Sequence, residues 1–395
     1  MAKKIIALLL ATIFLAAVLV GCQKKENPPA APSGAAPSGA PSSNAGEIVI
    51  GIYLPMTGSN AAGGEMSMEG INLAHEQNPS VLGRPIKLAL VDDKSDKVEA
   101  SNAVTRLIER DKVCAIIGSY SSGLAIPGSE VAQAAGIPMV ANTATNPLVT
   151  QGKSFIFRAC FIDPLQGTAL AQFAVNELSA KSAMIILDAS NDYSVGIANF
   201  FRKAFEEAAG VTVTDVKYKS GDQEFSAQLA EIKKTQPDVL FIPAGNYGDA
   251  GLIAKQARDL GITAVFMGPD TWDTPEFAEI GGAAIDGSYF STHFDPLRTG
   301  ESAAAYCKAF EAKYNKPSSS AAALSYDAYM LIYDAIKRAG SDNPAAIRDA
   351  LASVKDFAGV TGVINFDENH NPVKDVIIEK IENSKFNFVK AVTPK

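Results

Sequence analysis

The sequence predicts an α/β protein built from two doubly wound lobes. Short runs of apolar and β-branched residues alternate with segments that carry apolar residues at helical spacing, first in one series and then in a second. Several strand candidates are continuous runs without polar alternation, as in VCAIIG at 113–118, AMIILD at 183–188 and VLFIPA at 239–244. Such runs are typical of parallel strands covered on both faces. Two successive β-α-β series therefore indicate two parallel sheets with helices on both sides.

The first series begins near Glu47, and the second begins near Ala183. The first has expected strands at Ile48–Leu54, Ile86–Asp92, Val113–Gly118 and Pro138–Asn142, and expected helices at Met66–Asn78, Lys97–Arg110 and Ala125–Ala135. The second has expected strands at Ala183–Asp188, Val211–Tyr218, Val239–Pro243 and Ala264–Met267, and expected helices near Tyr193–Ala209, Glu224–Thr235 and Asp249–Leu260. Gly136, Gly210 and Gly261 support the helix ends, because glycine tolerates the left-handed conformation that closes a helix.

The chain after Asp286 is too short for a third domain, so we expect it to return and complete both lobes. Its expected elements are a strand at Gly287–His293, helices at Glu301–Tyr314, Ser319–Ala339 and Pro344–Ser353, and β-like runs at Val363–Phe366, Val376–Ile381 and Phe386–Lys390. The chain would then cross between the lobes three times, first through Phe155–Asp163. The expected N-terminal lobe is 47–163 with 294–373, and the expected C-terminal lobe is 164–293 with 374–395.

The N-terminus has the order of a secretory signal: Lys3 and Lys4, the uncharged run Ile5–Val20, the small residue Gly21, and then Cys22. The pattern resembles the bacterial lipobox, in which cleavage leaves the cysteine as a lipid-modified N-terminus. We therefore expect a lipoprotein signal peptide at 1–22 with Cys22 as the lipid attachment site. A transmembrane anchor is the alternative, but a helix of this run rises only ~24 Å against the ~30 Å of a bilayer core.

Residues 23–46 hold five prolines among Ala, Ser and Gly and no large apolar residue. Such a segment buries too little surface to offset the entropy of ordering, so we expect a disordered tether between the membrane and the body. The predicted location is the periplasm or cell surface, with a lipid anchor in a membrane. The formal net charge is −8 and falls to −10 without the two signal lysines, which gives no reason to expect a nucleic-acid partner.

Three cysteines remain beside Cys22, and each has apolar neighbours. An odd number leaves at least one free thiol in an oxidising compartment. We expect Cys114, Cys160 and Cys307 to be buried and free, with a Cys160–Cys307 disulfide as the alternative. The chain has no CxxC motif and no His–Cys cluster, so we expect no metal site and no cofactor.

Ligands of open parallel sheets bind beyond the carboxyl ends of the strands. The first-lobe loops place hydroxyls at helix starts, which suits a carboxylate or a phosphate. The second-lobe loops place the carboxylate of Asp270 among aromatic side chains, which suits an ammonium group with an apolar neighbour. Together the two ends would bind a zwitterionic amino acid, although hydroxyls after strands often serve only as helix caps. The candidate residues are Ser121, Ser122, Thr143, Thr145, Tyr193, Asn246, Tyr247, Asp270 and Trp272.

Three segments carry a family resemblance: EIVIGIYLPMTGSNAAGG at 47–64, FMGPDTWDTPEF at 266–277 and YDAY at 326–329. In order and spacing they resemble the periplasmic binding proteins of branched-chain amino acid ABC importers, the leucine/isoleucine/valine-binding family. The resemblance implies the type I clamshell, with two Rossmann-like lobes and three crossovers.

The same resemblance implies a role for each matching residue. Ser122 and Thr145 would bind the ligand carboxylate. The backbone carbonyl of Thr143 and the carboxylate of Asp270 would bind the ammonium group, and Tyr193 would close over the ligand.

Two positions depart from the family pattern. Ala62-Gly63-Gly64 stands where many relatives have an aromatic residue, and Asn246 stands where some have a tyrosine, with Tyr247 one step on. Both departures fall where the ligand side chain would lie. The glycines could admit a larger side chain, and Trp272 could stack on an aromatic one. The sequence thus predicts an α-amino acid and leaves open whether its side chain is branched and aliphatic.

The expected function is capture of a branched-chain or other apolar amino acid between two lobes and its delivery to ABC permease subunits in the inner membrane, by a monomer. A clamshell sensor, or a binding protein for a related small carboxylate, amide or aromatic acid, is the alternative. We expect no catalysis, because the three histidines, His75, His293 and His370, belong to no recognisable triad and GxSxG, HExxH and P-loop motifs are absent.

Overall fold

The structure is a computed structural model that describes residues 46–297 and 301–393, with only the backbone of Glu301 and Ser302. The predicted signal peptide, the lipid attachment site Cys22 and the tether up to residue 45 lie outside the described residues. Within them, none of the helices is long and apolar enough to cross a membrane.

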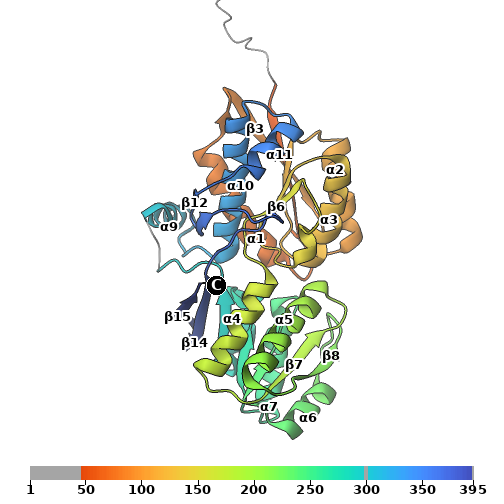
Figure 1. The fold of residues 1–395 in the computed structure, drawn as a ribbon, viewed down its shortest axis with the longest axis vertical. Coiled ribbons are helices and arrows are strands. Elements are labelled where there is room, and N and C mark those ends of the chain that lie inside the picture. The colour runs from red at the N-terminus through yellow and green to blue at the C-terminus, as the bar shows by residue number, and fades with distance from the viewer. Residues whose placement is uncertain (1–45, 298–300, 394–395) are drawn as a thin grey trace, which may run out of the picture. The chain divides into compact units, whose positions relative to one another are not determined.

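The first sheet has six strands among the described residues, in the order β2-β3-β1-β4-β5-β6 (Figure 1). All neighbouring pairs are parallel except the antiparallel pair of β2 and β3. The bounds are β1 (Ile48–Leu54), β2 (Ser80–Val81), β3 (Arg84–Asp92), β4 (Ala115–Ile117), β5 (Met139–Ala141) and β6 (Ile156–Arg158).

The second sheet has seven strands in the described part of the chain, in the order β15-β14-β11-β10-β9-β7-β8. Its first five strands in sequence are parallel, and β14 and β15 add an antiparallel edge beside β11. The bounds are β7 (Ala183–Asp188), β8 (Thr214–Tyr218), β9 (Val239–Phe241), β10 (Val265–Gly268), β11 (Tyr289–Thr292), β14 (Val376–Glu382) and β15 (Lys385–Val392). A separate hairpin pairs β12 (Phe357–Gly359) with β13 (Gly362–Ile364).

Helices cover both faces of each sheet. One face of the first sheet packs on α1 (Ala61–Gln77), α10 (Ser320–Ala339) and α11 (Pro344–Ala352), and the other on α2 (Lys97–Glu109) and α3 (Ser122–Ala135). One face of the second sheet packs on α4 (Asp163–Asn176) and α5 (Asp192–Ala209), and the other on α6 (Ser226–Thr235), α7 (Tyr247–Asp259) and α8 (Pro275–Gly281). Helix α9 (Glu301–Tyr314) packs beside α1 and α10, and single 3₁₀ turns lie at Pro147–Val149, Asp270–Trp272 and Gly282–Ile285.

The uniformly apolar strands are explained by this double cover. Ile50 and Ile52 of β1 point into the core beside α1 and α10. Tyr53, on the opposite face of the strand, points into the core beside α2 and α3. Successive strand residues point to opposite faces, so a strand that is buried on both sides has no polar position. In β7 the same alternation sends Ile185 and Ile186 to different cores.

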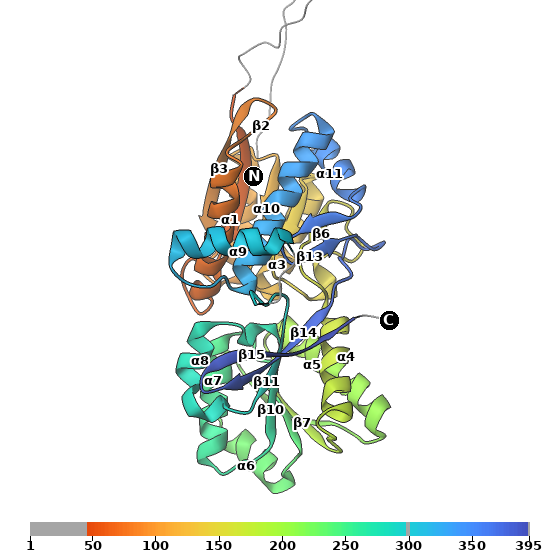
Figure 2. The same cartoon turned by 90° about the vertical axis from the view of Figure 1, so that its left-hand side faces the viewer.

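The chain crosses between the two sheets three times. It leaves the first sheet after β6 and enters the second through α4, returns after β11 to α9 and α10, and crosses again between β13 and β14. Figure 2 shows β14 and β15 beside β11, although α9, α10 and α11 intervene in the sequence. Two doubly wound sheets with three crossings confirm the predicted fold class.

Several local predictions differ from the structure. Strand β6 and helix α4 were not predicted, since the segment from Phe155 onward was taken only as a connection. Helix α1 begins at Ala61 rather than Met66, so Ala62-Gly63-Gly64 lies in its first turn. The glycines are needed there, because a Cβ on Gly64 would lie 2.1 Å from the backbone oxygen of Pro55 and one on Gly63 would lie 2.4 Å from the Tyr120 ring.

Cys114, Cys160 and Cys307 are all free. The first two are buried as predicted, whereas Cys307 is only half-buried, with its Sγ 4.0 Å from the backbone oxygen of Pro296. The alternative Cys160–Cys307 disulfide is not formed.

Candidate functional site

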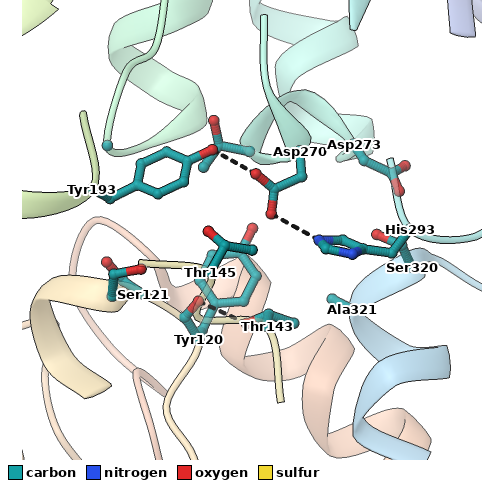
Figure 3. A pocket seen from close by; sticks show the side chains of 13 residues that line it. Tyr120, Ser121, Thr143, Thr145, Tyr193, Asp270, Asp273, His293, Ser320 and Ala321 are labelled. Carbon is teal, nitrogen blue, oxygen red and sulfur yellow. Dashed lines mark hydrogen bonds and ion pairs between the residues drawn. The ribbon is translucent and has the colours of Figure 1, made fainter. Parts of the chain in front are cut away.

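A cavity of about 30 Å³ lies where the strand ends of the two sheets meet (Figure 3). Its lining comes from the loops that follow β4, β5, β9, β10 and β11, and from the starts of α3 (Ser122–Ala135), α5 and α10. This is the edge at which open parallel sheets bind ligands. The lining residues are Tyr120, Ser121, Ser122, Thr143, Thr145, Tyr193, Gly245, Asp270, Thr271, Asp273, His293, Ser320 and Ala321.

The first-lobe wall presents hydroxyls at the N-terminus of α3. Ser122 is the first residue of the helix, and its Oγ accepts the backbone N–H of Asn146 at 3.1 Å, which leaves its own proton available. Ser121 precedes the helix and makes no capping hydrogen bond with its side chain. The N–H groups of a first helical turn have no partner within the helix and carry partial positive charge. This wall therefore suits an anionic group.

Thr145 lies beside this helix end and is 1% exposed. Its Oγ1 lies near the Asp163 carboxyl, yet it makes no hydrogen bond of acceptable distance and angle. The loop is held in place by the buried guanidinium of Arg158, which donates to the backbone oxygens of Ala144 at 2.7 Å and Asn146 at 2.9 Å. The Thr145 hydroxyl is thus held at the cavity wall and remains free to form a hydrogen bond with a ligand.

Thr143 uses its side chain within the protein. Its Oγ1 donates to the backbone oxygen of Tyr120 at 2.7 Å, which joins the loops after β4 and β5. The backbone carbonyl of Thr143 is therefore the group that this residue can offer to a ligand. The aromatic ring of Tyr120, on the loop after β4, supplies apolar surface to the cavity together with Ala321.

The second-lobe wall centres on the carboxylate of Asp270, the first residue after Pro269 at the end of β10. Its Oδ1 accepts the hydroxyl of Tyr193 at 2.5 Å, and its Oδ2 lies 3.1 Å from Nε2 of His293. Figure 3 shows the two rings on either side of the carboxylate. Burial, followed by the charge of Asp270, raises the pKa of Tyr193 well above its ordinary value, so the phenol stays protonated and donates.

Carboxylates are gathered around this wall. Burial raises the pKa of Asp163 to about 8, and Asp270 adds to the rise. Loss of water around Asp273 raises its pKa as well, against hydrogen bonds from Ser320 and Thr292. A concentration of acidic groups in a dry site attracts a cation. The second-lobe wall therefore suits an ammonium group.

Six of the nine predicted side chains line the cavity. They are Ser121, Ser122, Thr143, Thr145, Tyr193 and Asp270.

The other three predicted residues lie elsewhere, and each has a structural task. Trp272 is fully buried and stacks on Phe277 with ring centroids 4.4 Å apart, because the turn at the end of β10 directs it into the core against Gly268. The expectation that it walls the ligand is therefore corrected. Asn246 caps α7 by accepting the N–H of Asp249 at 2.8 Å. Tyr247 turns its hydroxyl to the backbone N–H of Ala62 at 3.3 Å.

The sequence predictions missed the other seven lining residues, which are Tyr120, Gly245, Thr271, Asp273, His293, Ser320 and Ala321. Tyr120 lies in the loop after β4 and His293 directly follows β11, so the rule that ligands meet strand ends could have found both. Ser320 comes from the start of α10, after the second crossing, and no local pattern indicates it.

Polar contacts join the two lobes around the cavity rim. The Nζ of Lys97 lies 2.7 Å from Oδ2 of Asp192, and the side-chain amide of Asn146 donates to the backbone oxygen of Asp192 at 3.0 Å. The Tyr247–Ala62 contact adds a third link. With these links in place the cavity has room for about two water molecules, so entry of a larger ligand requires the lobes to separate.

Comparison with known proteins shows which family the chain belongs to. Residues 47–385 match the family described as "Periplasmic binding protein". The chain belongs to the periplasmic binding protein family. This membership confirms the predicted family, and it implies a location outside the cytoplasm.

Three relatives of this periplasmic binding protein cover most of its length. The leucine binding protein LivK from Thermotoga maritima is 42% identical, with a TM-score of 0.86 over 88% of this chain and 99% of that one. The branched-chain amino acid transporter substrate binding protein LivJ from Streptococcus pneumoniae, solved in complex with isoleucine, is 33% identical, with a TM-score of 0.82 over 88% of this chain and 100% of that one. The Leu/Ile/Val-binding protein BraC3 from Rhizobium johnstonii is 31% identical over 82% of this chain and 88% of that protein. The solved relatives confirm the type I clamshell fold.

Proposed function

We propose that this protein captures an α-amino acid between its two lobes and delivers it to the permease of an ABC importer. The observation that carries the proposal is the pairing of two opposite ends in one cavity: hydroxyls at the N-terminus of α3, and the carboxylate of Asp270. A zwitterion needs both ends at once. The names of the relatives, which are leucine- and branched-chain amino acid-binding proteins, support the same class of ligand.

Each end of the ligand has its own set of partners in this proposal. The ligand carboxylate accepts hydrogen bonds from the hydroxyls of Ser122 and Thr145 and from the first N–H groups of α3. The ammonium group donates to the carboxylate of Asp270 and the backbone carbonyl of Thr143. The phenol of Tyr193 stays bonded to Asp270 and covers the ligand from the second lobe.

Closure of the lobes supplies the mechanism. A ligand bound to the first lobe alone leaves its ammonium group facing water, whereas closure pairs both charges and excludes water. The ligand therefore favours the closed state through contacts that exist only there. Hinge closure of this kind is well known for periplasmic binding proteins, and the closed shape is what a permease would recognise.

The side chain of the ligand would meet the rings of Tyr120 and Tyr193 and the methyl group of Ala321. This surface is mainly carbon, which fits a branched-chain or other apolar amino acid. Tyr120, rather than Trp272 as expected from the sequence, would thus provide the aromatic ring that packs on the ligand side chain. A protein that binds and closes in this way performs no chemical step, and we propose that it has no catalytic activity.

The test is a thermal-unfolding screen of the purified chain against the twenty amino acids, after a cycle of unfolding and refolding that removes carried-over ligand. A ligand at 100 times its dissociation constant adds ~2.7 kcal/mol to the native state. We expect leucine, isoleucine, valine or another apolar amino acid to raise the melting temperature most. The proposal fails if all twenty amino acids leave it unchanged while small carboxylates without an amino group raise it.

We also propose that the protein is a monomer anchored to a membrane through lipid on Cys22, with residues 23–46 as the tether. The support is the sequence pattern of residues 1–22. Cys22→Ser should move the protein from the membrane fraction to the soluble extracytoplasmic fraction, or leave an uncleaved precursor. A Cys22→Ser protein that is cleaved and lipidated like the wild type would refute the anchor.

A further inference from the structure

His293 connects the carboxylate of Asp270 to two of the three crossings. It directly follows β11, where the chain leaves the second sheet for the second crossing. Its ring stacks on Phe161 with centroids 3.6 Å apart, and Phe161 lies on the first crossing, between β6 and α4. The side chain is almost fully buried, with 4% of the residue exposed. The imidazole is therefore held from the crossings rather than from the ligand-binding loops.

The remaining contact of the ring points to its role. Nε2 lies 3.1 Å from Oδ2 of Asp270, and a carboxylate can only accept, so the imidazole donates. The other nitrogen, Nδ1, has no hydrogen-bond partner among the described residues. Oδ1 of the same carboxylate is occupied by the Tyr193 hydroxyl. Two donors on opposite oxygens fix the rotation of the carboxylate, which leaves one remaining lone pair on each oxygen in a defined direction.

We propose that His293 is a positioning residue that aims the carboxylate of Asp270 at the ammonium group of the ligand. The inference rests on the proposed function, because it requires a ligand with an ammonium group at this site. It adds that affinity depends on a residue of the crossing segment. The donor on Oδ2 and the stacking on Phe161 are separable contributions, and only the donor acts on the ammonium group.

His370 provides a matched control. Its ring also stacks on a phenylalanine near the first crossing, Phe157, with centroids 4.1 Å apart. Its Nδ1 lies 2.9 Å from the backbone oxygen of Ile156, and its ring has no hydrogen bond or ion pair with a carboxylate of the described residues. A substitution at His370 therefore perturbs the same kind of stacking without touching Asp270.

The experiment compares two ligands in four proteins by isothermal titration calorimetry. The ligands are the amino acid that gives the largest thermal shift in the screen above and the carboxylic acid of the same skeleton without the amino group. The proteins are the wild type, His293→Phe, His293→Gln and His370→Phe. His293→Phe keeps a ring for stacking and removes the donor, while His293→Gln restores a donor without the ring. His293→Leu is a second donorless variant if His293→Phe does not fold.

We expect His293→Phe to weaken binding of the amino acid about tenfold or more, because hydrogen bonds to charged groups are among the stronger ones. Binding of the acid without an amino group should change less than threefold. His293→Gln should recover most of the loss, and His370→Phe should leave both ligands within threefold of the wild type.

Equal weakening of both ligands by His293→Phe would show that the residue only supports packing, and would overturn the inference. So would an affinity for the amino acid that is unchanged or higher. If the wild type binds no amino acid, the proposed function fails and this inference fails with it. A wild type that binds the amino acid, with a His293→Phe loss that is the same for both ligands, overturns the inference alone and leaves the proposed function in place.

Discussion

Substitution of Asp270 by asparagine should separate ligand binding from stability. The change keeps the size of the side chain and removes its negative charge. One oxygen can still accept from Tyr193 or from His293, but the amide NH₂ faces the other donor. The side chain is 11% exposed, so water offers little compensation to an ammonium group that loses its counter-ion.

The expected loss of affinity follows from the energy of a buried charge pair. Hydrogen bonds to charged groups contribute about 1.5–3 kcal/mol, and breaking a buried ion pair costs about 3–5 kcal/mol. A loss of about 3 kcal/mol corresponds to a roughly 150-fold weaker dissociation constant.

The stability of the ligand-free protein should change much less than its affinity. Asp270 adds to the rise in the pKa of Asp163, and it lies near Asp273 in the same wall. Removal of its charge relieves repulsion between these carboxyl groups. The hydrogen bond lost at the amide NH₂ opposes this relief, so we expect the free energy of unfolding without ligand to stay within about 1 kcal/mol of the wild type.

Thermal unfolding with and without ligand measures both effects. A gain of ~2.7 kcal/mol at 100 times the dissociation constant, divided by an unfolding entropy of ~2.1 cal/mol/K per residue for ~350 residues, gives a shift of about 4 °C for the wild type. Asp270→Asn at the same ligand concentration should shift by less than about 0.5 °C. Asp192→Asn, at the exposed rim beside Lys97, is the control and should keep its affinity within threefold. An Asp270→Asn protein within threefold of the wild-type affinity would refute the assignment of Asp270 to the ammonium group.

Three further predictions concern the core and its titration. Gly70→Ala should lower the free energy of unfolding, measured by urea titration, by about 1–3 kcal/mol. The added Cβ would lie 1.9 Å from the backbone oxygen of Ala322, where α1 packs on α10. An unchanged urea midpoint would contradict this close packing. Trp272→Phe, in the core, should lower the free energy of unfolding by about 1–2 kcal/mol and keep ligand affinity within threefold of the wild type. A tenfold loss of affinity would instead indicate that Trp272 contacts the ligand. Burial, followed by repulsion from other carboxyl groups, raises the pKa of Glu379 from 4.5 to about 9, so folding takes up a proton and stability falls as pH rises through that window. Glu379→Gln should reduce the fall by up to about 1.4 kcal/mol per pH unit, and an identical slope in the variant would refute the buried neutral carboxyl.

Much of the fold was predictable because its signals are local. Strands such as β1, β4 and β7 are buried on both faces and so consist almost entirely of apolar residues in sequence. Helix ends such as Gly210 adopt the left-handed conformation for which glycine is suited. Boundaries were less certain where tertiary contacts compete with composition, as at the first turn of α1, where glycine is required by the close approach of Pro55.

The candidate site, too, was predictable where its signals are local and not where it depends on tertiary contacts. The sequence by itself determined that Ser122, Thr145 and Asp270 follow strands, and parallel strands carry such residues to one edge. Only the tertiary structure decided which residues of these loops line the cavity. The short turn after β10 points Asp270 into the cavity and Trp272 into the core. Likewise His293 reaches Asp270 because the second crossing starts there, and Ser320 arrives after a further crossing. Contacts between segments far apart in the chain depend on how the lobes pack together, and no local pattern of residues encodes that geometry.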